Sequence, residues 1–121
     1  MPNLYETNSF KEIDNKIVAT ISINKNHDIF SGHFPGNPVM PGVCMIQIIK
    51  ELTEKALGEE LFMTASSNIK FMALINPKEN PVLQIEIDYE KKSDSYKIKS
   101  TTTMEKTVAL KFTGNYKISK K

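Results

Sequence analysis

The chain lacks arginine and tryptophan and has one cysteine among its 121 residues. The lone Cys44 excludes an intramolecular disulfide and a cysteine-based zinc site, and it fits a reducing compartment. All sixteen basic residues are lysines, scattered among fourteen acidic residues to a net charge of +2. Without arginine there is no bidentate guanidinium recognition of phosphate or guanine, and the lysines form no basic stripe. Nucleic-acid binding is therefore not expected.

Long apolar runs are also missing. Residues 1–20 carry acids and amides where a signal peptide needs an unbroken apolar stretch, and no later run approaches membrane-spanning length. We therefore expect a cytoplasmic protein with no membrane association. The length and the 40% hydrophobic content indicate a single domain over residues 1–121. A chain of this size buries roughly two-thirds of its unfolded surface, so a large active-site cavity would favour oligomerisation.

Glycine and proline concentrate in one segment, residues 32–42, with the sequence GHFPGNPVMPG. Three of the five glycines and three of the six prolines lie there. Proline removes a backbone donor and glycine lowers the cost of unusual dihedral angles, so neither a regular helix nor a strand is expected. The segment is predicted to be a shaped loop between two regular elements.

Hydrophobic spacing around this loop predicts one helix and several strands. Alternation over residues 17–24 predicts a strand with one buried face. Pro41 suits a helix start, residues 43–52 are apolar nearly all round, and Gly58 suits the helix end. We therefore expect protein to wrap the first half of this helix. Four further strands are predicted at residues 62–75, 82–90, 96–104 and 107–118.

This order of elements implies an α+β fold, in which a single antiparallel sheet curls around one central helix. No metal-ligand spacing, glycine-rich nucleotide loop or cofactor motif occurs in the sequence. We therefore expect neither a bound metal nor a nucleotide cofactor.

Two histidines are available as bases. His27 lies in the polar turn NKNHDIF and is expected to be a solvated loop residue. His33 lies inside the loop, beside Phe34 and just ahead of the helix start. A loop backbone that is constrained in this way usually positions a functional side chain. The local sequence leaves two alternatives for His33, a structural residue that caps the loop and a functional base.

The segment GHFPGNPVMPGVCMIQ resembles the active-site segment of the FabA/FabZ-type 3-hydroxyacyl-acyl-carrier-protein dehydratases. In that family GHFPG is followed by one residue, Pro, an aliphatic pair or Met, then PG and a hydrophobic helix. The predicted order of strands agrees with the hotdog fold of the family, and FMALINP is similar to the start of its next strand. The resemblance thus implies a hotdog fold and a role in fatty-acid or related acyl-chain biosynthesis.

The resemblance also implies roles for individual residues. His33 would be the general base that removes the α-proton of a 3-hydroxyacyl thioester, with its tautomer fixed by the carbonyl of Val39. The N–H of Gly42, at the helix N-terminus, would stabilise the thioester oxygen as negative charge gathers there. The expected substrate contacts are Phe34, Val39, Pro41 and Val43.

Gln47 stands fourteen residues after His33, where the family has the Glu or Asp that acts as general acid. A glutamine amide can hold a hydroxyl or a water but cannot protonate a leaving hydroxide, and loss of a general acid typically costs roughly 10²–10⁴-fold in rate. One alternative keeps dehydratase activity, with Gln47 in the site and Glu51, one helical turn on, as a substitute acid. The sequence favours the other interpretation of Glu51, a solvated charge paired with Lys55.

Two other functions stay open from the sequence. One is a non-catalytic subunit that holds an acyl chain or docks a carrier protein, with or without a catalytic paralogue. The other is a hotdog acyl thioesterase in which His33 activates water. Cys44 corresponds to a hydrophobic position of the family and is expected in the core rather than as a nucleophile. An adaptable acyl tunnel could be lined by Met40, Met45, Met63, Met72 and Met104.

The partners follow from the resemblance. It implies no tightly bound cofactor, because the substrate arrives on the phosphopantetheine arm of an acidic acyl carrier protein. Lys70 and Lys78 are candidate contacts for that carrier. The resemblance further implies a homodimer or a trimer of dimers, since in the family the histidine of one chain faces the acid of another.

Overall fold

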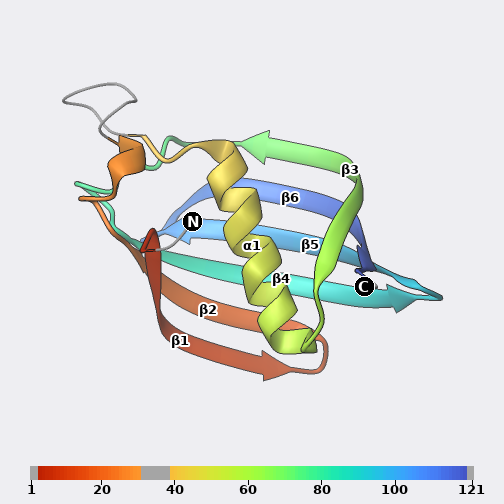
Figure 1. Cartoon of the computed structure of the whole chain (residues 1–121). Helices are drawn as coiled ribbons and strands as arrows, with labels where there is room; N and C mark the ends of the chain where they lie inside the picture. Colours follow the sequence, from red (N-terminus) through yellow and green to blue (C-terminus); the bar gives the residue numbers. More distant parts are fainter. Residues whose placement is uncertain (1–2, 31–38, 120–121) are drawn as a thin grey trace.

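The computed structural model describes residues 3–30 and 39–119, apart from the side chains of residues 66 and 67. That part of the chain forms a six-stranded antiparallel sheet in the order β1-β2-β4-β5-β6-β3, and one long helix crosses its concave face (Figure 1). The elements are β1 (Tyr5–Ile13), β2 (Lys16–Ile23), a 3₁₀ turn (Asp28–Phe30), α1 (Gly42–Leu57), β3 (Leu61–Phe71), β4 (Val82–Lys92), β5 (Ser95–Met104) and β6 (Thr107–Ile118).

The core lies between α1 and the sheet. Alternate residues of each central strand point toward the helix and are buried, as the period-two pattern predicts. The helix buries five apolar residues against them, namely Cys44, Met45, Ile48, Ile49 and Leu52. Burial raises the pKa of the Cys44 thiol, so Cys44 is a core residue and not an activated nucleophile.

The two ends of α1 are where the sequence predicts them. Pro41 is the N-cap, with an extended backbone that lets the helix begin at Gly42. Gly58 ends the helix with a left-handed φ of 69°, and its N–H donates to the Glu54 carbonyl at 2.8 Å. The expected wrapping of the first half is wrong at Val43, which is 74% exposed.

β1 is not predicted by the sequence pattern. Its half-buried residues include Tyr5, Thr7 and Phe10, because a shift in the pairing with β2 between Thr7 and Ser9 changes which residues face inward. The bulge therefore breaks the alternation that would have marked a strand. The strand expected at 62–75 is also shorter than predicted and ends at Phe71.

The glycine and proline loop lies mostly in residues 31–38, outside the described residues. No helix in the described part of the chain is both long enough and apolar enough to cross a membrane.

Candidate functional site

A largely apolar pocket of about 460 Å³ opens at the N-terminal end of α1. Pockets of this volume are typical of small-molecule sites. Its walls come from the helix start, from the segment that follows β3 and from the beginning of β6. The lining residues are Val39, Met40, Pro41, Gly42, Met45, Phe71, Met72, Ala73, Leu74, Ile75, Ala109 and Leu110.

Backbone hydrogen bonds fix these walls relative to one another. The Met40 N–H donates to the Ile75 carbonyl at 2.8 Å and ties the segment before the helix to the segment after β3. The N–H groups of Met72 and Ala73 both donate to the Ala109 carbonyl, at 2.8 and 3.3 Å, and tie that second segment to β6. The pocket is therefore framed by main chain and not only by side chains.

Gly42 allows the side chain of Phe71 to lie against the helix start. A Cβ atom at position 42 would lie 2.4 Å from Cζ and 2.7 Å from Cε1 of the Phe71 ring. These distances are too short for any side chain, so this wall requires glycine at position 42 while the ring keeps its place. Phe71 is itself 61% exposed and forms part of the pocket mouth.

The helix start leaves two backbone donors without acceptors. The N–H groups of Cys44 and Met45 both donate to the Pro41 carbonyl, at 3.1 and 3.3 Å. Within residues 3–30 and 39–119, the N–H groups of Gly42 and Val43 have no acceptor. The helix dipole adds partial positive charge at this end, so the apolar pocket that Gly42 lines lies beside a donor suited to a partly negative oxygen.

A second group of polar side chains lies one to two turns along α1. The Gln47 amide nitrogen Nε2 donates to Glu51 Oε2 at 3.0 Å, and the Tyr5 hydroxyl donates to Glu51 Oε1 at 2.7 Å. Lys55 does not pair with Glu51, because its Nζ lies 4.7 Å from the centroid of the Phe10 ring. Glu51 is therefore not the solvated partner of Lys55 that the sequence allows.

The structure brings only some of the predicted site residues together. Val39, Pro41 and Gly42 line the pocket, whereas Val43 projects outward and is not part of the lining. The Gln47 and Glu51 pair lies apart from the pocket lining. The predicted residues His33 and Phe34 fall outside the described residues.

One polar contact and six pocket residues were not predicted from the sequence, the six being Phe71, Ala73, Leu74, Ile75, Ala109 and Leu110. Phe71 and Leu74 lie in the segment FMALINP, whose similarity to the family was the available signal. Of the five methionines expected to line a tunnel, Met40, Met45 and Met72 line this pocket. Tyr5 is 46 positions from Glu51 in the sequence and had no local signal.

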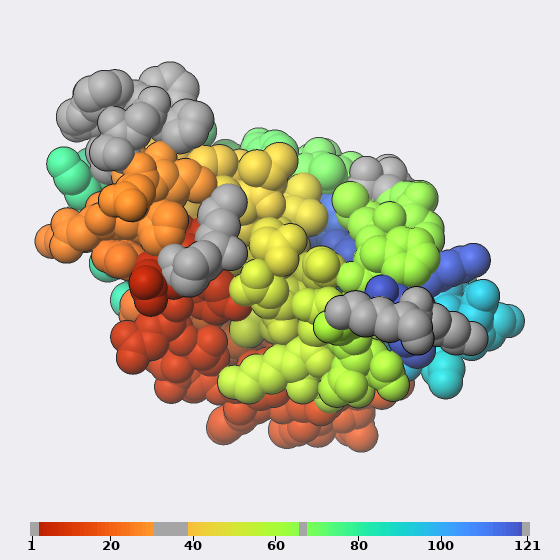
Figure 2. All heavy atoms as spheres, viewed as in Figure 1, coloured from red at the N-terminus to blue at the C-terminus, as the bar shows by residue number. Residues whose placement is uncertain are grey.

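Apolar side chains extend from the pocket along β3, which is an edge strand of the sheet. Figure 2 shows the outward face of α1 lying open at the surface between β1 and β3. The exposed apolar residues of β3 are Phe62, Met63, Ile69 and Phe71. An uncovered apolar edge of this kind is typical of an interaction surface. Among the described residues, no three His, Cys, Asp or Glu side chains gather in a way that could hold a metal ion.

Comparison with known proteins gives relatives for nearly the whole chain. The ApeI-like family, ApeI dehydratase, matches residues 9–111. The 3-hydroxyacyl-[acyl-carrier-protein] dehydratase FabZ of Lactobacillus helveticus is 33% identical over 90% of this chain and 81% of that protein. FabZ of Rickettsia felis is 36% identical over 88% of this chain and 81% of that protein.

Solved structures agree on the fold. The dehydratase heterocomplex ApeI:P from Xenorhabdus doucetiae superposes with a TM-score of 0.81 at 18% identity, over 93% of this chain and 96% of that chain. A hypothetical thioesterase from Streptococcus pneumoniae, solved with coenzyme A, gives a TM-score of 0.68 at 18% identity over 95% and 85%.

A sheet wrapped around one helix, with a pocket at the helix start, defines a hotdog-fold protein, and the predicted α+β class is confirmed. The chain belongs to the ApeI-like dehydratase family, and the predicted relationship to the FabZ dehydratases is confirmed with it.

Proposed function

We propose that the protein eliminates water from a 3-hydroxyacyl thioester to give a trans-2-enoyl thioester, with the acyl chain carried on an acyl carrier protein. The observation that carries this proposal is the apolar pocket lined in part by Gly42 at the α1 N-terminus, whose N–H has no acceptor among the described residues. Apolar walls suit an acyl chain, and the donors suit the thioester oxygen. The FabZ relatives bear the name of this activity.

The chemistry assigns a role to each residue. His33 removes the proton from C2, and the resulting enolate oxygen is stabilised by the N–H of Gly42 together with that of Val43. Val39 and Pro41 line the entry beside them, and Phe34 adds a further apolar contact. The C3–O bond then breaks, and the hydroxide must receive a proton to leave as water.

Glu51 is not the source of that proton in this proposal. Both of its oxygens accept hydrogen bonds, from Tyr5 and from Gln47, so both are already engaged within the chain. The proton that His33 has taken from C2 is returned from the imidazolium to the departing hydroxyl, so that one residue serves as base and then as acid. Gln47 contacts the hydroxyl during this transfer. The protein itself requires no cofactor in this proposal, because the phosphopantetheine arm that carries the substrate belongs to the carrier protein.

The carrier protein would approach the mouth of the pocket. Phe71 and Leu74 are exposed there, and the neighbouring Lys70 and the nearby loop residue Lys78 are exposed cations. An acidic carrier surface would meet these lysines as point charges, with a strength that falls as salt rises.

A second copy of the chain is proposed to cover β3 and the outward face of α1. Support comes from the exposed apolar residues of this edge strand and from Val43, which is exposed and is not among the residues that line the pocket. Pairing along β3 gives a homodimer, which can associate further into a trimer of dimers. A paralogous hotdog chain is the alternative occupant, since the similar ApeI:P structure is a heterocomplex.

The test is an assay of 3-hydroxyacyl-carrier protein conversion to the trans-2-enoyl form, with free thiol measured in the same tube. We expect turnover by the wild type, no thiol release, and at least roughly a 100-fold loss in His33→Ala. The matched control is His27→Ala, which removes the other histidine of the chain and should retain activity. Thiol release without enoyl formation would show a thioesterase instead, and binding without turnover would show a non-catalytic subunit.

A further inference from the structure

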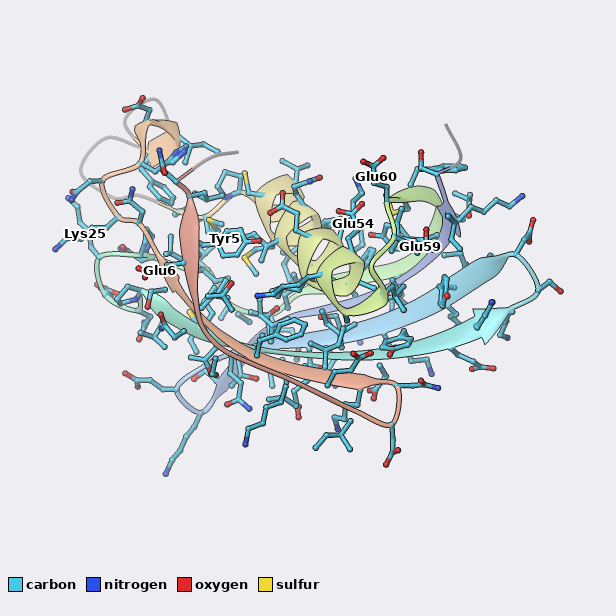
Figure 3. All side chains as sticks on the ribbon, turned by 60° about the horizontal axis from the view of Figure 1, so that its bottom comes forward. Tyr5, Glu6, Lys25, Glu54, Glu59 and Glu60 are labelled. Carbon is cyan, nitrogen blue, oxygen red and sulfur yellow. The ribbon has the colours of Figure 1, made fainter. Side chains whose placement is uncertain are left out.

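The contact between Tyr5, Glu51 and Gln47 joins the N-terminal end of β1 to the middle of α1. Figure 3 shows Tyr5 on the helix side of β1 and its neighbour Glu6 on the other side. From there the Tyr5 hydroxyl reaches Glu51 Oε1 at 2.7 Å, while Gln47 Nε2 reaches Glu51 Oε2 at 3.0 Å. Each oxygen of one carboxylate is thus engaged by a different donor.

This arrangement fixes the direction of the Gln47 amide. An amide has an NH₂ group that donates and a carbonyl oxygen that accepts, whereas an ionised carboxylate only accepts. Glu51 therefore attracts the NH₂ group of Gln47 and repels its carbonyl oxygen. The carbonyl oxygen Oε1 must point away from Glu51, and within the described part of the chain no donor reaches it.

Tyr5 holds Glu51 in place for this task. Burial, and then the hydrogen bond to Glu51, raise the pKa of the Tyr5 hydroxyl well above its usual value, so the hydroxyl stays protonated and keeps donating. With one oxygen tied to Tyr5 on β1, the carboxylate cannot rotate freely about its own axis. Its second oxygen therefore stays directed at Gln47.

Gln47 lies on a partly covered face of the helix. It lies one turn after Val43, and residues four apart share a helix face. Val43 is 74% exposed and Gln47 is half-buried, so the described part of the chain covers this face only in part. A ligand or a neighbouring subunit that covers it would meet the Gln47 carbonyl oxygen.

We propose that Tyr5 and Glu51 are positioning residues that lock the Gln47 amide with its carbonyl oxygen presented to the substrate, so that the site selects a hydrogen-bond donor, the 3-hydroxyl group, over an acceptor. This inference rests on the proposed function, because that function supplies the hydroxyl. A carbonyl oxygen favours a 3-hydroxyacyl chain and disfavours a 3-oxoacyl chain, whose ketone can only accept.

The test compares binding of two probes that differ only at C3. These are 3-hydroxyacyl and 3-oxoacyl derivatives of pantetheine with the same chain length, in which an amide replaces the thioester so that elimination is suppressed. The wild type should bind the hydroxyl probe more tightly than the oxo probe, by a factor on the order of ten, which corresponds to about one hydrogen bond.

Glu51→Gln is the informative variant. A glutamine at position 51 can donate to the Gln47 carbonyl, which lets the Gln47 amide turn round and present its NH₂ group. The preference should then disappear or reverse toward the oxo probe, and Tyr5→Phe should reduce it partly. Glu59→Gln is the matched control, because it removes an exposed carboxylate just beyond the helix and should keep the wild-type preference.

The outcomes separate positioning from a structural role. If Glu51→Gln and Tyr5→Phe weaken both probes equally, the residues only support the fold and the inference is overturned. It is also overturned if the folded variants keep the wild-type ratio, or if the wild type does not discriminate. If the wild type discriminates but never turns over the true substrate, the proposed function fails while the positioning role stands.

Discussion

At the scale of single residues, the core contains hydroxyl groups without partners. Within the described residues, Tyr116, Ser100 and Thr102 are buried and their hydroxyl oxygens make no hydrogen bond. A buried unpaired hydroxyl costs about 1–3 kcal/mol in the free energy of unfolding. Burial also raises the pKa of Tyr116 to about 12.

Replacing Tyr116 with phenylalanine should leave the protein as stable or make it more stable, by up to about 2 kcal/mol, since the ring stays and the unpaired hydroxyl goes. Urea unfolding at neutral pH measures this. A clear loss of stability would show that the hydroxyl has a partner.

The same group predicts alkaline sensitivity. The phenol of Tyr116 has a raised pKa in the folded protein, so its contribution to stability is complete below the usual value of 10.0 and is lost as pH rises toward about 12. Between these pH values, the free energy of unfolding should fall less steeply with rising pH for Tyr116→Phe than for the wild type. If the free energy of unfolding depends on pH in the same way in both proteins, the raised pKa of Tyr116 is contradicted.

The Gln47 and Glu51 pair makes a further prediction at this scale. Gln47→Glu places two carboxylates one helical turn apart, and like charges at this spacing destabilise a helix by roughly 0.2–0.5 kcal/mol. The loss should appear at neutral pH and diminish as acid protonates one of the pair. Exchanging both residues, as Gln47→Glu with Glu51→Gln, should restore stability at neutral pH.

At the scale of elements, the alternation of apolar and polar residues and the positions of proline and glycine predict most of the fold. β2, β4, β5 and β6 follow clean period-two patterns, and Pro41 and Gly58 mark the helix ends. β1 could not be predicted, because its bulge shifts the inward-facing residues and most of its side chains are polar. Local patterns carry no information about where such a shift occurs.

The site was predictable only where it is local in sequence. Val39, Pro41 and Gly42 are neighbours in the glycine and proline segment, and all three line the pocket. Phe71 reaches the pocket from β3, and Tyr5 reaches Glu51 from β1, through contacts that the tertiary fold alone creates. Such long-range contacts leave no spacing in the sequence.

The strand β6 depends on a glycine within its length. A Cβ atom at Gly114 would lie 2.6 Å from Cζ of Phe112 and 3.4 Å from Cε1 of Tyr116, and both rings are buried. We expect Gly114→Ala to lower the free energy of unfolding by about 1–3 kcal/mol through overpacking. Gly42→Ala is the comparison, because the Phe71 ring that it meets is exposed and can move aside.

Urea denaturation should therefore show a larger loss for Gly114→Ala than for Gly42→Ala. In contrast, acyl-ligand binding should suffer more in Gly42→Ala, since that substitution displaces Phe71 from the pocket wall. A larger loss of stability for Gly42→Ala than for Gly114→Ala would contradict the expectation that the Phe71 ring can move aside and the Phe112 ring cannot.

At the scale of the whole molecule, one edge of the sheet differs from the other. β3 presents exposed apolar side chains beside the pocket, whereas β1 is mostly polar and has Ile13 as its one large exposed aliphatic residue. The asymmetry favours association along β3. Association along β3 would bring the pocket of each chain near the contact between subunits, because Phe71 of β3 lines that pocket.

Ile69→Lys should weaken the proposed association along β3 at least tenfold, because the substitution would bury a charge among apolar residues. Sedimentation velocity measures the effect, with Ile13→Lys on the opposite edge as the matched control that should remain associated. Dissociation by Ile13→Lys alone would place the contact at β1. A wild type that is monomeric until a second hotdog chain is added would point to a heterocomplex.

We would first measure dehydration of a 3-hydroxyacyl-carrier protein by the wild type and by Gln47→Glu, side by side, with free thiol monitored. We expect the wild type itself to form the enoyl product, with Gln47 in place and without thiol release. If only Gln47→Glu is active, the proposed function is wrong and the native protein is a binding subunit on a scaffold competent for catalysis.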